Sequence, residues 1–356
     1  MKSGYGTVVR IAAIVVSLIA LAHATHAQFQ GGRGGVNPRD PQSATQAPVQ
    51  AVSTEPPPLE TDLVLLTVSV APPEKSPRPS LTREHFQILE DGVEQKIVYF
   101  WEDSRPITVG LLIDDSDYMT ANMKLSNLRE TLPTFLKTKN PADEYFVIQF
   151  ASFPRMTVSY TTDAKLAPTN FRTMDDSTVP PPDTALNDAI YLGLESIKEG
   201  ANSRKALVVI TAGGDKGCDG SQQTMKNEGL LAFALKQPVQ IYSIMMTDDW
   251  GTANNGNPCD QISKDVNNLD ELAGSTGGKE FLSPNAEGAV NAIAREIAFA
   301  LKTQYLIGFR STDTAKDGKR RGIKVKVEPP AGSPKLKVWT KNAYYPPKEK
   351  APKSTK

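Results

Sequence analysis

The feature that most constrains this chain is an alternation of apolar, strand-like runs with amphipathic, helix-like stretches between residues 105 and 303. The run at 107–114 is almost continuously apolar until its final aspartate, which is typical of a parallel strand buried on both faces. The stretch at 119–137 follows, and leucines recur at helical spacing on one of its faces, namely Leu125, Leu128, Leu132 and Leu136. This alternation predicts an α/β fold with a doubly wound, mostly parallel sheet that helices cover on both faces.

We expect this α/β unit to span 104–303. Apolar strand-like runs and helical spacing of apolar residues also predict its other elements. Short strands at 145–150 and 156–160 lie close enough in sequence to form a hairpin. Further strands are predicted at 206–210, 239–245 and near Phe281. Further helices are predicted at 184–199, 222–236, 265–274 and 286–301.

Two β-rich segments, 59–103 and 304–347, flank the α/β unit. Neither has the number of strands that an independently stable sheet needs, so we expect the two segments to pair into one small sheet. In the second segment, residues 323–327 alternate strictly and give one apolar and one basic face.

A tight turn is predicted inside the first of these segments. Asp91-Gly92 supplies the positive φ angles that a two-residue hairpin turn requires. The strands on either side of this turn are predicted at 86–89 and 96–100.

Residues 1–27 have the parts of a secretory signal peptide. Positive residues precede an apolar run at 11–22, and either Ala24 or Ala27 could precede the cleavage site. This run is shorter than the ~20 residues that span a bilayer, although an uncleaved anchor is the alternative interpretation. We therefore expect a secreted or periplasmic protein with no membrane span after cleavage.

Two further segments have the composition of unstructured chain. Residues 28–58 are rich in Gly, Gln and Pro and have few large apolar side chains, which predicts a disordered linker. Residues 348–356 are expected to form a disordered tail.

The charge balance limits the class of partner. Lys+Arg and Asp+Glu number 40 each, whereas nucleic-acid binding normally needs a basic excess. We therefore expect no nucleic-acid partner.

The two cysteines, Cys218 and Cys259, are an even count in a chain expected to leave the cytoplasm. Each follows one of two neighbouring parallel strands, so both loops are expected to emerge at the same edge of the sheet. We predict a disulfide between them, with two unpaired buried thiols as the alternative.

Acidic and hydroxyl residues gather in the loops that follow three of the predicted elements. Ligands of doubly wound sheets bind outside the carboxyl ends of the strands, near the switch in strand order. Three segments belong to this edge: Asp114-Asp115-Ser116-Asp117-Tyr118-Met119, Thr184-Ala-Leu-Asn-Asp188-Ala, and Thr211-Ala212-Gly213-Gly214-Asp215.

At these residues the chain resembles the von Willebrand factor A (VWA) family. That family has a strand ending in Asp-x-Ser-x-Ser, a helix that begins Thr-x-Leu-x-Asp-Ala, and a strand followed by Ser/Thr-Asp-Gly. The flanking β segments, with Glu90-Asp91-Gly92 before and Tyr344-Tyr345-Pro346 after, further resemble VWA-related secreted proteins of acidobacteria.

The resemblance implies a metal-ion-dependent adhesion site that holds Mg²⁺ through oxygen ligands and binds a carboxylate of a partner. Asp114, Ser116 and Thr184 match the ligand positions of the family. Two positions depart from the pattern, because Tyr118 replaces the second Ser and Ala212 replaces the loop Asp.

These departures bear on metal binding. Mg²⁺ needs six oxygens at ~2.0–2.1 Å in near-octahedral geometry, and a Tyr oxygen lies too far from its Cα to replace a Ser oxygen. Asp117 and Asp215 are nearby carboxylates that could compensate for the lost ligands. We expect a degenerate site with no cofactor or only weak Mg²⁺.

The resemblance and the residues together predict a protein-binding or scaffolding module, not an enzyme. The expected contact residues are on the rim of the sheet: Asp115, Asp117, Tyr118, Asp215 and Trp250. For Trp250 the alternative is packing within its own loop. A metal-dependent ligand binder, a hydrolase and a structural envelope protein are the alternative functions.

Three observations stand against the hydrolase. Cleavage of the signal would leave His85 as the one histidine, and we expect it on the surface. The sequence has no Gly-x-Ser-x-Gly or Cys-x-x-Cys motif. The stretch Ala273-Gly-Ser-Thr-Gly-Gly-Lys279-Glu280 is close to a phosphate-binding loop but lacks the first Gly and the final Ser/Thr of that motif. It also runs from helix to strand, so we expect it to serve as a turn.

Overall fold

A computed structural model describes most of the chain beyond the expected linker. All described residues belong to one unit, Ala51–Lys356. The described ranges are 62–73, 75–116, 119, 128, 131–135, 140–163, 184–212, 226–247, 262–284 and 288–348.

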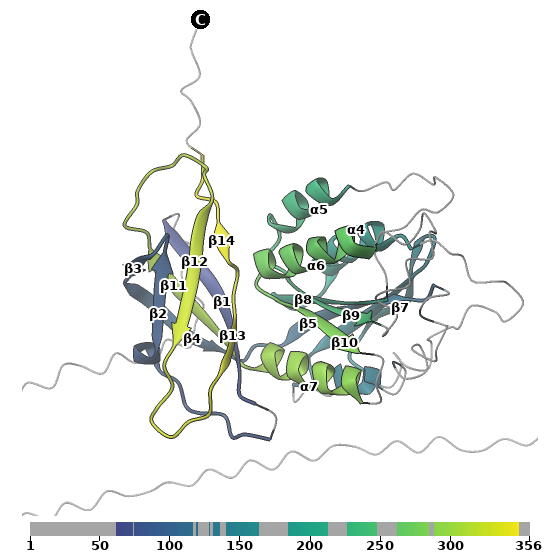
Figure 1. Ribbon diagram of the computed structural model, residues 1–356, viewed down its shortest axis with the longest axis horizontal. Coiled ribbons are helices and arrows are strands. Elements are labelled where there is room, and N and C mark those ends of the chain that lie inside the picture. Colours follow the sequence, from purple (N-terminus) through teal and green to yellow (C-terminus); the bar gives the residue numbers. More distant parts are fainter. Residues whose placement is uncertain are drawn as a thin grey trace, which may run out of the picture. The chain divides into compact units, whose positions relative to one another are not determined.

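A six-stranded sheet in the order β7-β6-β5-β8-β9-β10 forms the centre of the α/β unit (Figure 1). All its neighbouring strands are parallel except β6 and β7, which form the predicted antiparallel hairpin. The fold class predicted from the sequence is therefore confirmed. The strands are β5 (Ile107–Asp114), β6 (Glu144–Phe150), β7 (Pro154–Thr161), β8 (Arg204–Thr211), β9 (Gln240–Thr247) and β10 (Glu280–Pro284).

Helices cover both faces of this sheet, as Figure 1 shows. All eight residues of β5 are buried, because its side chains alternate between two separate apolar clusters. One cluster includes α7 and the helical residues 131–135, and the other includes α4, α5 and α6. The helical elements are α4 (Leu186–Ser196), η3 (Ile197–Glu199), α5 (Asn227–Ala234), α6 (Ile262–Thr276) and α7 (Ala289–Lys302).

The two flanking segments pair with each other, but they build two sheets where one was expected. The first sheet has the order β13-β1-β11-β4 and the second β14-β12-β2-β3, so each contains strands from both segments. Their inner faces share a core that includes Leu66, Ile88, Ile307 and Ile323. The reason is that β1 and β11 carry an apolar face that a single sheet would leave exposed to water.

These strands are short, and their bounds follow the sequence closely. From the first segment come the strands β1 (Leu63–Ala71), β2 (Phe86–Glu90), β3 (Val93–Gln95) and β4 (Ile97–Asp103), and the 3₁₀ helix η1 (Arg83–His85) precedes β2. From the second segment come β11 (Gln304–Arg310), β12 (Arg321–Val327), β13 (Lys337–Trp339) and β14 (Ala343–Tyr344).

The turn at Asp91-Gly92 is where the sequence placed it, but the strand that follows it is not. Asp91 and Gly92 have φ angles of 46° and 86°, and Glu90 pairs with Val93 across the turn. The hairpin ends at Gln95, and β4 crosses to the other sheet to pair with β11. The predicted partner at 96–100 is thus wrong, because Phe100 stacks on Tyr305 at 5.4 Å in the shared core.

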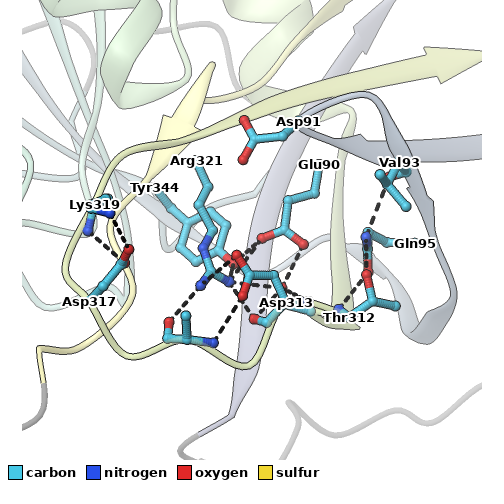
Figure 2. Close-up of polar contacts among 12 residues, drawn as sticks. Glu90, Asp91, Val93, Gln95, Thr312, Asp313, Asp317, Lys319, Arg321 and Tyr344 are labelled. Atoms are coloured by element: carbon cyan, nitrogen blue, oxygen red, sulfur yellow. Dashed lines mark hydrogen bonds and ion pairs between the residues drawn. The ribbon is translucent and has the colours of Figure 1, made fainter.

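A buried ion pair joins β2 to β12 inside the sandwich (Figure 2). Arg321 Nη1 lies 3.4 Å from Glu90 Oε1, and the two side chains are 5% and 3% exposed. Ser311 donates to Glu90 Oε2 at 2.6 Å, and Arg321 also donates to the carbonyls of Asp313 and Ala315. The buried charges are therefore compensated, and the loop between β11 and β12 is held by Arg321.

The stretch that resembles a phosphate-binding motif is a turn only in part, because residues 274–276 end α6 and the turn begins at Gly277. Gly277 has a φ of 92°, and a Cβ on Gly278 would lie 1.9 Å from the carbonyl oxygen of Ile241. The two glycines thus allow the end of α6 to approach β9 closely.

Among the described residues, no helix combines the length and the apolar character that crossing a membrane requires.

Candidate functional site

The candidate site lies where the strand order of the central sheet reverses. From β5 the chain proceeds through β6 and β7 on one side and later through β8, β9 and β10 on the other. Asp114 is the last residue of β5 and Thr211 the last of β8, so both stand at the carboxyl end of this switch point. Doubly wound sheets leave a crevice there for ligands.

Asp114 is fully buried and its carboxylate accepts three internal hydrogen bonds. Oδ1 accepts from the backbone N–H of Ser116 at 2.9 Å. Oδ2 accepts from Thr211 Oγ1 at 2.6 Å and from the backbone N–H of Ala212 at 3.3 Å. Burial raises the pKa of Asp114, and these hydrogen bonds offset part of the rise.

Asp115 forms an ion pair that the sequence analysis did not foresee. Its Oδ2 lies 2.7 Å from Nη2 of Arg155, and its side chain is 0% exposed. Its backbone N–H donates to the carbonyl of Phe150, which fixes the loop to the end of β6. Burial raises the pKa of Asp115, Arg155 opposes the rise, and the neighbouring Asp114 adds to it.

Two oxygens of this loop are buried without a hydrogen-bond partner. They are Oδ1 of Asp115 and Oγ of Ser116, and both residues are 0% exposed. The Ser116 side chain lies close to Asp114 and lowers the pKa of that carboxyl. A buried polar group that stays unpaired costs about 1–3 kcal/mol, so a ligand that paired with these oxygens would recover that free energy.

Thr184 and Ala212 complete the described part of the edge. Thr184 is buried just before α4, and the next residue, Ala185, donates its N–H to the carbonyl of Ala151 at 2.6 Å. Ala151 follows Phe150, which bonds to Asp115, so the three segments converge on the end of β6. Ala212 faces Asp114 with its backbone N–H and supplies no side-chain oxygen.

Six residues predicted for the rim and the disulfide lie outside the described residues. Their predicted roles on the rim and in the disulfide therefore stay predictions. They are Asp117, Tyr118, Asp215, Cys218, Trp250 and Cys259.

The β6–β7 turn adds two residues that sequence reasoning missed. Phe153 is 64% exposed, and Arg155 pairs with Asp115. Their position in the sequence could have indicated this role. The turn after the predicted strand 145–150 must begin at the same edge of the sheet as the loop after β5. Across the ranges that the structure describes, no group of three or more His, Cys, Asp or Glu side chains could hold a metal ion.

No protein-family model matches the sequence, and no curated protein matches it. Among solved structures, the conserved hypothetical protein BatB of Bacteroides thetaiotaomicron is similar at 20% identity and a TM-score of 0.42, over 55% of this chain and 100% of that one. The SpRpn10 VWA domain is similar at 15% identity and a TM-score of 0.37, over 52% and 92%.

A third solved structure is the proximal thread matrix protein 1 of the mussel byssus, with a zinc-occupied MIDAS motif. It is similar at 13% identity and a TM-score of 0.43, over 59% of this chain and 49% of that one. A VWA domain and a protein with a MIDAS motif are thus among the structures to which this chain is similar.

Proposed function

We propose that this chain is a secreted or periplasmic binding or scaffolding module that engages another protein at the switch-point edge of its central sheet. The observation that carries the proposal is the pair of buried, unpartnered oxygens on Asp115 and Ser116 at this edge. A ligand that supplied hydrogen bonds or charge there would remove the cost of leaving them unpaired. The signal-like residues 1–27 support a place outside the cytoplasm.

A protein partner is favoured by the exposed apolar side chains on the hairpin that supplies Arg155. Phe153 and Met156, which flank Arg155 on the β6–β7 hairpin, are 64% and 38% exposed. Aromatic residues, Met and Arg are enriched in protein–protein interfaces. The sequence adds Trp250 to this rim as a predicted contact.

We propose that the metal site of the family is degenerate in this chain. Within the described residues, Asp114 is engaged by three internal hydrogen bonds and Asp115 by Arg155. Ser116 and Thr184 are the hydroxyl oxygens that match the family, and Ala212 offers none. These residues do not fit the six-oxygen shell that Mg²⁺ requires, so binding is absent or weak.

We also propose that the chain is not an enzyme. Its one histidine beyond the signal-like segment, His85, lies in η1 of the sandwich and not at the rim. There its Nδ1 accepts the backbone N–H of Thr82 at 2.9 Å, in the local turn that begins β2. A hydrolase acting at the rim would therefore need a general base other than histidine.

A metal-dependent ligand binder is the second candidate. It is favoured by the Ser116 hydroxyl, since a buried oxygen without a hydrogen-bond partner is free to ligate a cation.

Site-directed photocrosslinking tests the proposal. Benzoylphenylalanine would replace Phe153 at the rim or, as a control, Tyr345, which is 53% exposed in the sandwich segment. We expect an adduct with one envelope protein from position 153 and none from 345, with the same yield in EDTA. Loss of the adduct in EDTA would support the metal-dependent alternative. Failure of position 153 to crosslink any protein in the native envelope would contradict the proposal.

A further inference from the structure

We propose that Arg155 is the fixed cation of the rim and excludes divalent metal by neutralising Asp115. This inference rests on the proposed binding function, because it concerns the charge of the same edge. Arg155 thereby affects which cations can bind at the rim. Neither the Asp114-x-Ser116 motif nor the replacements at Tyr118 and Ala212 indicate this role.

The geometry of the pair is that of a tethered counter-ion. Arg155 enters from β7, 40 positions along the chain from Asp115, and places Nη2 2.7 Å from Oδ2. The carboxylate is fully buried, while 30% of the arginine side chain reaches solvent. Within the described chain this is the one hydrogen bond of the guanidinium, so the interaction that holds the cation at the rim is the one with Asp115.

The local charge explains why a cation is required. Asp114 and Asp115 are adjacent buried carboxylates, and each would be costly to ionise in this environment without compensation. Without the guanidinium, Asp115 would lose its paired cation while it still lies beside the Asp114 carboxylate and the Ser116 hydroxyl. Hard oxygen ligands with excess negative charge are what Mg²⁺ and Mn²⁺ prefer.

A purely structural role for Arg155 makes a different prediction. If Arg155 only fixed the position of the loop after β5, its loss would loosen the loop and weaken any cation binding. If it acts through charge, its loss would strengthen cation binding. The sign of the change therefore separates the two roles.

The chain contains a matched control pair. Arg105 Nη2 lies 2.7 Å from Asp103 Oδ2, and the two side chains are 32% and 6% exposed, against 30% and 0% for Arg155 and Asp115. Arg105→Gln thus removes an ion pair with the same N–O distance and similar burial that is not part of the rim.

Calorimetric titration of the purified, EDTA-treated protein with MgCl₂ and MnCl₂ tests the proposal. We expect Arg155→Gln to bind either ion about tenfold more tightly than the wild type, because the variant removes one positive charge that repels a divalent ion at this edge. Arg155→Lys, which keeps the charge, and Arg105→Gln should match the wild type. Asp115→Asn combined with Arg155→Gln should lose the gain.

Equal or weaker binding by Arg155→Gln would overturn the proposal, as would an equal gain in Arg155→Lys. Arg155→Met, which keeps the apolar stem, repeats the measurement if the Gln variant does not fold. Tight Mg²⁺ binding by the wild type would count against the metal-independent function. The role of Arg155 is tested by the ratio of the metal dissociation constants of Arg155→Gln and the wild type.

Discussion

Gln304 accepts two hydrogen bonds from the guanidinium of Arg204 at its side-chain Oε1, from Nε at 3.2 Å and from Nη2 at 2.8 Å. This contact joins the first residue of β11 in the sandwich to the first residue of β8 in the central sheet. The Gln304 amide also donates to Ser69 Oγ at 3.1 Å, and Ser69 shares a hydrogen bond with the Tyr242 hydroxyl at 3.2 Å. All four side chains are at least nine-tenths buried, so a polar network lies between the two parts of the fold.

The first prediction concerns this network. Gln304→Leu keeps the volume but removes the acceptor of the Arg204 guanidinium and the donor to Ser69 Oγ in the interior. Each unpaired group costs about 1–3 kcal/mol, so we expect a loss of about 2–4 kcal/mol in the free energy of unfolding in urea. Gln87→Leu, which removes a hydrogen bond to Glu94 near the surface, should change stability by less than about 0.5 kcal/mol. Equal losses in the two variants would show that the network adds nothing.

The second prediction uses two consecutive arginines. Arg321 is 4% exposed and pairs with Glu90, whereas Arg320 is exposed. Arg321→Met leaves the Glu90 carboxylate buried without its partner, which costs about 3–5 kcal/mol. Arg320→Met should be nearly neutral. Chemical denaturation of both variants decides the matter, and a small effect at Arg321 would contradict the assigned role.

The third prediction is a pH dependence at Glu280. Burial raises the pKa of Glu280 to about 7, and Asp270 adds to the rise. The folded state thus holds the proton more tightly than the unfolded state, so this contribution to stability is complete below about pH 4.5 and is lost as the pH rises towards 7. Glu280→Gln has no carboxyl to ionise, so the variant should not lose this stability as the pH rises.

Thermal unfolding across this pH range measures that effect. Glu280→Gln should melt higher than the wild type at pH 8, with the difference shrinking towards pH 4.5. Glu271→Gln, at an exposed position of α6, is the control and should show no such trend. A difference that does not depend on pH would contradict the prediction.

The fourth prediction compares two glycines near the end of α6. A Cβ at Gly278 would lie 1.9 Å from the carbonyl oxygen of Ile241, so Gly278→Ala forces the backbone apart. We expect a loss of at least about 1–3 kcal/mol. Gly274→Ala meets its nearest atom at 3.4 Å and improves helix propensity, so it should be neutral or stabilising. Similar melting temperatures for the two variants would refute the packing argument.

The fifth prediction is the Cys218–Cys259 disulfide, whose residues lie outside the described ranges. An oxidising compartment favours the bridge, and closing a loop of about 40 residues would contribute about 3–4 kcal/mol by the chain-entropy estimate. Mass spectrometry of non-reduced peptides from periplasmically expressed protein measures it. Two thiols that alkylate without prior reduction would rule the bridge out.

Local patterns were enough to predict the central sheet. The apolar run of β5, the leucine spacing of the following helix and the Asp91-Gly92 turn each report on a few neighbouring residues. Side-chain period and turn conformation depend on near neighbours, so a single sequence carries them. The same logic placed Asp114, Ser116 and Thr184 at the carboxyl edge of the sheet.

Tertiary structure alone decided which distant segments meet. Nothing in the run 97–103 distinguishes a partner in β2 from one in β11, because both would bury the same aromatic side chains. In the sequence, nothing distinguishes Arg155 from other charged residues near turns. Its pairing with Asp115 depends on the folded structure. Strand pairing and ion pairing depend on burial and distance in space, and those quantities exist only once the whole chain has packed.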